Sequence, residues 1–62
     1  MKIINAIKKL EKSGYVVGVK SKVHYIATNN SRIIKFVDNG SGEITSIETG
    51  NVFFDNLTQA MS

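Results

Sequence analysis

The spacing of the apolar residues changes at Gly14, and this change constrains the fold more than any other feature of the sequence. Before Gly14, apolar residues recur at the three- and four-residue spacing of one helix face: Ile3, Ala6, Ile7 and Leu10. A glycine directly after such a segment is typical of a helix end. After Gly14 the period becomes two, beginning at Tyr15. We therefore predict a helix that ends near Gly14 and is followed by strands.

Three further segments have the composition of strands, namely "VHYIAT", "RIIKFV" and the weaker "EITSIE". Asn29 and Asn30 separate the first two segments, and asparagine tolerates the positive φ of a tight turn. "DNGSG" precedes the third segment. We therefore predict tight turns at Asn29–Asn30 and around Gly40.

The end of the chain has helical spacing again, because Phe54, Leu57 and Met61 fall on one side of a helix with Asn51 as a candidate N-cap. No linker or repeat interrupts the chain. The sequence thus predicts a single α+β domain over residues 1–62. Its elements are an N-terminal helix, a four-stranded antiparallel β-meander and a C-terminal helix.

The chemistry of the side chains limits what can hold this domain together. The 62 residues include no cysteine and one histidine, which excludes disulfides and argues against a metal site. We expect no cofactor, and a core of apolar packing supplemented by an oligomer interface. No apolar run reaches the roughly 18 residues of a membrane span, and "MKIINAIKKLEK" lacks the apolar region of a signal peptide. The expected location is the cytoplasm.

Charge is distributed unevenly along the chain. All 8 Lys and Arg residues lie within residues 1–35, where Glu11 is the single acid, and residues 36–62 contain acids but no base. A basic half is what nucleic acid or an acidic protein recognises, although lysines also serve solubility. The candidate nucleic-acid-binding residues are Lys8, Lys9, Lys12, Lys20, Lys22, Arg32 and Lys35.

Strand registers drawn from these turns divide the side chains between two faces of the sheet. One face is core and carries the aromatic residues of the strands, with the first helix against it. The second face has a row of β-branched residues: Val16, Ile26, Ile33 and Ile47. Such a row is too apolar to be left to water. Either the C-terminal helix covers it, or both helices lie on the first face and the row forms an interface with a protein partner or a second copy.

A second row predicted on the same face contains His24, with Gly18 and Lys35 as its neighbours. Lys20 and Lys22 lie shortly before His24 in the chain, so this place suits a phosphate or the polar margin of a dimer interface. Catalysis has little support, because the row holds no carboxylate or second base that would activate a nucleophile.

The segment "LEKSGY", followed by His24 ten residues after Gly14, resembles the opening of HicA-type toxins. The tail "TGNVFFDNLTQA" is similar to the way that family enters its last helix. The resemblance implies a fold like that of double-stranded-RNA-binding domains, cleavage of mRNA, and His24 as the catalytic residue. Lys22 and Val23 stand where the family has Gly-Ser, so the turn before the histidine differs.

Three functions therefore remain open from the sequence. The leading one is a small non-enzymatic accessory protein, of the kind found in phage or mobile-element genomes, which binds a protein through the second sheet face and the basic half. The second is sequence-nonspecific binding of RNA or DNA by the lysines and Arg32. The third is a toxin-like ribonuclease that uses His24.

Overall fold

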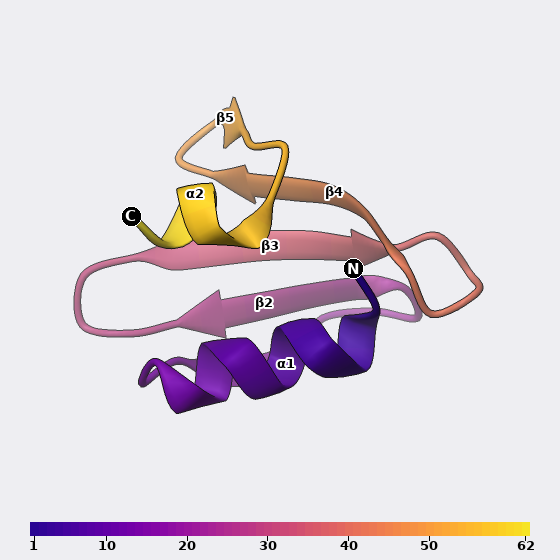
Figure 1. The fold of residues 1–62 in the computed structure, drawn as a ribbon, viewed down its shortest axis with the longest axis horizontal. Helices are drawn as coiled ribbons and strands as arrows, with labels where there is room; N and C mark the ends of the chain where they lie inside the picture. Colours follow the sequence, from indigo (N-terminus) through magenta and orange to yellow (C-terminus); the bar gives the residue numbers. More distant parts are fainter.

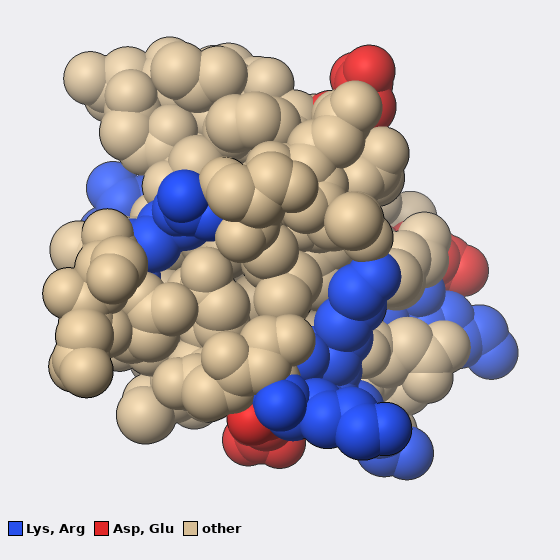
Figure 2. Space-filling model, turned by 60° about the vertical axis from the view of Figure 1, so that its left-hand side comes forward, with Lys and Arg blue, Asp and Glu red and all other residues tan.

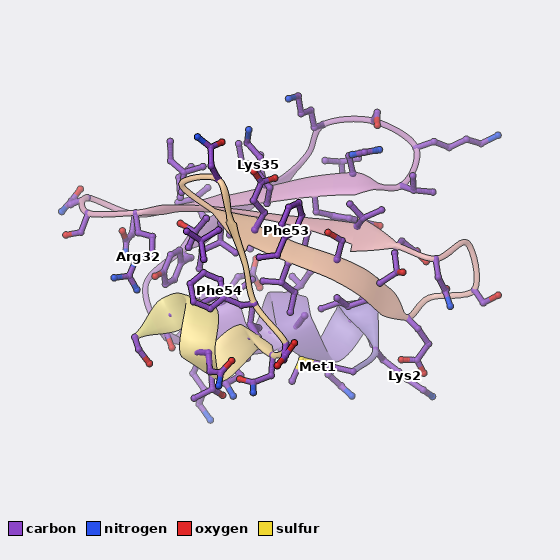
Figure 3. All side chains as sticks on the ribbon, turned by 90° about the horizontal axis from the view of Figure 1, so that it is seen from above. Met1, Lys2, Arg32, Lys35, Phe53 and Phe54 are labelled. Atoms are coloured by element: carbon purple, nitrogen blue, oxygen red, sulfur yellow. The ribbon has the colours of Figure 1, made fainter.

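The protein consists of one antiparallel sheet with both helices on the same side of it (Figures 1 and 3). A computed structural model describes residues 1–62. Its elements are α1 (Ile3–Lys12), β1 (Val16–Val19), β2 (His24–Thr28), β3 (Ile33–Asp38), β4 (Ile44–Thr49), β5 (Val52–Phe53) and α2 (Leu57–Met61). The strands lie in the order β1-β2-β3-β4-β5, which confirms the predicted α+β meander and adds one short strand to it. Neither helix has the length and apolarity that crossing a membrane requires.

Helix α1 ends where the sequence predicts, and backbone hydrogen bonds explain why. Gly14 has φ of 90°, a conformation that costs glycine little. Its N–H donates to the Glu11 carbonyl at 3.1 Å, and the Tyr15 N–H donates to the Leu10 carbonyl at 3.0 Å. This pair of bonds is the Schellman motif. Both Leu10 and Tyr15 are buried, so the motif also anchors the start of β1 to the core.

The unpredicted strand β5 follows a two-residue turn at Gly50 and Asn51, which have φ of 57° and 68°. Positive φ at both central positions is the signature of a type I′ hairpin turn. Asn51 therefore belongs to this turn, and the prediction that it caps the last helix is wrong. The N-cap of α2 is Asn56, whose Oδ1 accepts a hydrogen bond from the Gln59 N–H at 2.9 Å.

The core lies between the sheet and the two helices. Figure 3 shows both helices beneath the sheet, and the Lys9 Nζ of α1 donates to the Thr58 Oγ1 of α2 at 2.6 Å. The alternative in which the C-terminal helix covers the second sheet face is therefore wrong. The buried residues come from both helices and four of the strands or their flanks: Ile3, Ala6, Leu10, Tyr15, Ala27, Ile34, Phe36, Ile47, Leu57 and Ala60. The rings of Tyr25 and Phe36 stack with centroids 5.3 Å apart.

The hairpin between β2 and β3 keeps the predicted faces but moves the turn by one residue. Its central residues are Asn30 and Ser31, because the Asn29 N–H donates to the Arg32 carbonyl at 3.1 Å. The Asn29 side chain fixes this position, since its Oδ1 accepts from the N–H groups of Ser31 and Arg32 at 2.8 Å each. Each β2 residue therefore pairs two positions further along β3 than predicted, with Tyr25 opposite Phe36. A shift of two leaves every side chain on its expected face.

The hairpin between β3 and β4 changes a face, because it contains a β-bulge. Asp38 pairs with Ile44 and Val37 pairs with Ser46, so Thr45 has no partner in β3. One extra residue in β4 reverses the alternation beyond it. As a result, Ile44 and Ile47 both pack against the core although they are three positions apart. The predicted row of Val16, Ile26, Ile33 and Ile47 is thus wrong for Ile47, which lies on the other face. It is also wrong for Ile26, which stays on the expected face but pairs with Gly18 and Lys35.

Candidate functional site

The side of the sheet away from the helices is not covered by any other part of the chain (Figure 3). We call it the outer face. The strand positions that alternate with the core residues define it: Val16, Gly18, His24, Ile26, Thr28, Ile33, Lys35, Val37, Ser46, Glu48 and Phe53. Apolar members reach far into solvent, since Val16 is 73% exposed, Ile33 is 53% exposed and Phe53 is 70% exposed. An exposed apolar surface of this kind is characteristic of an interaction site.

The observed registers place the outer-face residues in three cross-strand rows. The first row is Val16, Thr28 and Ile33. The middle row is Gly18, Ile26, Lys35, Glu48 and Phe53, and the third is His24, Val37 and Ser46. Of the four residues predicted to share one row, the structure leaves Val16 and Ile33 together, moves Ile26 to the middle row, and buries Ile47.

The middle row crosses the whole sheet and carries two opposite charges at its centre. Lys35 is exposed, Glu48 is half-buried, and the two residues are paired neighbours on β3 and β4. Neither takes part in a salt bridge, since the single salt bridge of the protein joins the Met1 amino group to Glu43. The charges of Lys35 and Glu48 are therefore available to groups outside the chain.

Phe53, like Glu48, is an outer-face residue that the sequence did not predict as part of the site. It belongs to β5, directly after the Gly50–Asn51 turn, and it pairs with Glu48. Its neighbour Phe54 points the other way and packs against the core (Figure 3). The Gly-Asn dipeptide between two β-branched residues was the signal for this hairpin.

His24 lies at the start of β2, exposed, with Val37 opposite it. Its predicted neighbours Gly18 and Lys35 pair instead with Ile26. The His24 side chain makes no hydrogen bond, and no three of the histidine and acidic residues gather closely enough to hold a metal ion.

The candidate nucleic-acid-binding residues lie on different sides of the molecule. Lys8, Lys9 and Lys12 belong to α1, Lys20 and Lys22 to the loop after β1, and Lys35 to the outer face. In the view of Figure 2, the basic side chains form two groups with uncharged surface between them. In this view the basic side chains form no single stripe of the kind that follows a phosphate backbone.

Two of these basic residues have structural partners within the chain. Arg32 donates from a guanidinium nitrogen to the Ala60 carbonyl at 3.1 Å, which satisfies a carbonyl in the last turn of α2. Lys9 bonds to Thr58, as described above. Both side chains therefore help to hold α2 against the rest of the fold.

Two hollows open on the surface. One, of about 630 Å³, lies between the turn that joins β2 to β3 and the turn that joins β4 to β5. Its polar lining includes Asn30, Arg32, Lys35 and Glu48. The other, of about 480 Å³, lies beside the start of α1 and is lined by residues that include Ile4, Ile7 and Tyr25. Both are wide open to solvent.

Comparison with known proteins adds no relative to this description. No family model, curated protein or solved structure matches the chain.

Proposed function

We propose that the protein is a non-enzymatic interaction module that forms a dimer through the outer face of its sheet. One observation carries the proposal. From β2 to β5 the middle row is apolar, basic, acidic and apolar, so it is complementary to the same row of a second copy that runs in the opposite order. The row has a cation and an anion at its centre, Lys35 and Glu48, and a large apolar residue on either side of them, Ile26 and Phe53.

The reversal corresponds to a two-fold axis that runs parallel to the strands, between β3 and β4. A second copy related by this axis sets β3 opposite β4, and β2 opposite β5. Lys35 of each copy then faces Glu48 of the other, and Ile26 faces Phe53. The same patch serves as both halves of the contact, which is the condition for an isologous dimer. Val16 on β1 lies outside this contact, because β1 has no strand opposite it.

The size of the outer face sets the expected strength of this dimer. Strands about 4.8 Å apart with a rise of about 3.3 Å per residue give a flat footprint of about 400 Å² per copy. A standard stable interface buries about 800 Å² per partner. We therefore expect a reversible dimer, in which the two Lys35–Glu48 contacts contribute specificity and make the association weaken with added salt.

Exchanging the charges tests this geometry directly. In Lys35→Glu the dimer axis brings acids together, and in Glu48→Lys it brings lysines together, so each variant alone should be monomeric. A mixture of the two variants should form a heterodimer, because the carboxylate introduced at position 35 of one chain meets the ammonium group introduced at position 48 of the other. Sedimentation velocity over a concentration series measures these states, and circular dichroism checks that each variant is folded.

An independent variant tests the apolar part of the row. Ile26→Lys should shift the protein to monomer, whereas Val16→Lys, outside the proposed contact, should leave the association unchanged. A wild-type chain that stays monomeric at the highest soluble concentration would overturn the proposal. Dimerisation that survives both single charge changes, or a variant mixture that stays monomeric while the wild type associates, would exclude this two-fold arrangement.

A further inference from the structure

Strand β1 forms one edge of the sheet, and half of its backbone groups have no partner. The Lys20 N–H donates to the His24 carbonyl at 2.8 Å, and hydrogen-bonded pairs alternate with non-bonded pairs along an antiparallel ladder. The bonded pairs further along are therefore Gly18 with Ile26 and Val16 with Thr28. The N–H and carbonyl groups of Val17 and Val19 point away from β2, toward the open edge.

Within Val16–Val19 this edge lacks the features with which natural sheets discourage pairing. Charged residues, proline and β-bulges are the usual protection of an edge strand. β1 has the sequence "VVGV", its register with β2 is regular, and Gly18 has no side chain to obstruct an incoming backbone. The side chains of Val16 and Val19, on opposite faces of the strand, are 73% and 69% exposed. The opposite edge of the sheet, β5, has two residues and offers far less.

The charges around β1 indicate what kind of strand it accepts. Lys20 and Lys22 follow the strand directly, and Lys12 precedes it at the end of α1. All three lysines are exposed and make no salt bridge, and Glu11 is the one acid nearby in the chain. Antiparallel pairing of β1 with β1 of a second copy brings Lys20 and Lys22 of each chain toward Lys12 of the other. Like charges placed opposite one another destabilise a strand pair.

We propose that β1 binds an extended segment of a partner protein as an additional strand, and that this segment is apolar in its middle and acidic at both ends. The backbone groups of Val17 and Val19 supply the hydrogen bonds, as in other cases of strand addition. The exposed side chains of Val16 and Val19 contact the apolar middle of the segment on the two faces. Lys12 at one end and Lys20 with Lys22 at the other select for acidic ends.

This site is independent of the proposed dimer. In the two-fold arrangement described above, β1 lies beyond the contact, so each copy of a dimer presents a free edge. A dimer then holds two such segments, and a partner with two acidic strands gains affinity from being bound at both. The edge is equally open in a monomer, so failure of the dimer proposal leaves this inference intact.

A synthetic probe tests the proposal on the complete protein. The probe is a capped peptide of alternating valine and threonine with glutamate at each end, and its control has lysine at each end. We expect the glutamate peptide to shift the amide resonances of Val17 and Val19 in ¹⁵N–¹H spectra and to slow their hydrogen exchange. The lysine peptide should bind at least tenfold more weakly.

Two protein variants separate strand addition from simple attraction of charges. Val19→Pro removes one donor at a position where an edge strand tolerates proline, and should weaken binding about fivefold, whereas Val19→Thr should not. Lys20→Glu combined with Lys22→Glu should reduce or reverse the preference for glutamate ends. Spectra of the free variants show whether each is folded.

Three outcomes would overturn the inference. The first is the absence of any shift at Val17 and Val19 with the glutamate peptide at low salt. The second is equal binding of a peptide in which the amides that face β1 are N-methylated, which would mean that charge alone attracts it. The third is protection of the Val17 and Val19 amides that grows with protein concentration in the absence of peptide, which would mean that a second copy occupies the edge.

Discussion

Replacing Ile47 and Ile33 by alanine, each in turn, tests the structure where it departs most from the sequence-based expectation. The register predicted from the sequence, which has no bulge in β4, sets these two isoleucines side by side in one row on the second sheet face. In the structure Ile47 is 5% exposed within the core, and Ile33 is 53% exposed on the outer face. The substitution is the same in both variants, so each serves as the control for the other.

The expected free-energy changes differ well beyond experimental error. Truncation of a buried isoleucine to alanine costs about 2–5 kcal/mol, through lost burial and the cavity that remains. A largely exposed strand position loses up to about 1 kcal/mol. A chain of this length has a free energy of unfolding of about 3–9 kcal/mol, so Ile47→Ala removes a large part of it. The midpoint of thermal unfolding should fall by about 4–8 °C per kcal/mol.

Urea denaturation followed by circular dichroism measures both values. The protein concentration should be low, so that any dimer is dissociated and the outer-face variant is compared as a monomer. Equal losses of stability in the two variants, or a larger loss for Ile33→Ala, would refute the bulged register of β4. A large loss for Ile47→Ala alone would support it.

Two further predictions concern asparagines with different structural tasks. Asn51→Val should destabilise the protein by about 1–2 kcal/mol, because a β-branched residue is strained at φ of 68°, whereas Asn51→Gly should be tolerated. Equal midpoints of thermal denaturation for these two variants would contradict the type I′ turn. Asn56→Ala should lower the free energy of unfolding by about 1 kcal/mol, because it removes the N-cap of α2, and Asn56→Asp should keep most of the stability that the cap supplies. Equal stabilities of these two variants in urea denaturation would argue against the cap.

Local chemistry explains the parts of the fold that the sequence predicted well. The glycine after Leu10 and Glu11 closes a Schellman motif, which depends on residues close together in the chain. Asn29 selects its turn through its own side chain, and the displacement from the predicted turn is a single residue. Because that displacement changes the register by two, Tyr25 and Phe36 still reach the core face.

The candidate site was predicted less completely, because it depends on several strands at once. That Val16, Ile26 and Ile33 share one face of the sheet followed from alternation alone, whereas the exposure of that face did not. The middle row could not be predicted in this way. Lys35 pairs with Glu48, and Glu48 with Phe53, only in the observed registers of β3, β4 and β5. His24 has different neighbours for the same reason, as two successive hairpins are each displaced by two positions.

The sequence alone determined the order of the helices and the first four strands, the end of α1, and the alternation of faces within β1, β2 and β3, because these properties arise from neighbouring residues. The tertiary structure decided the side on which α2 packs and the face to which Ile47 belongs. Helix α2 has five residues, too few to be stable without the sheet and α1 against which it packs. The bulge at Thr45 lets Ile44 and Ile47 both enter the core, and the burial of both side chains stabilises an irregularity that a two-residue period does not contain.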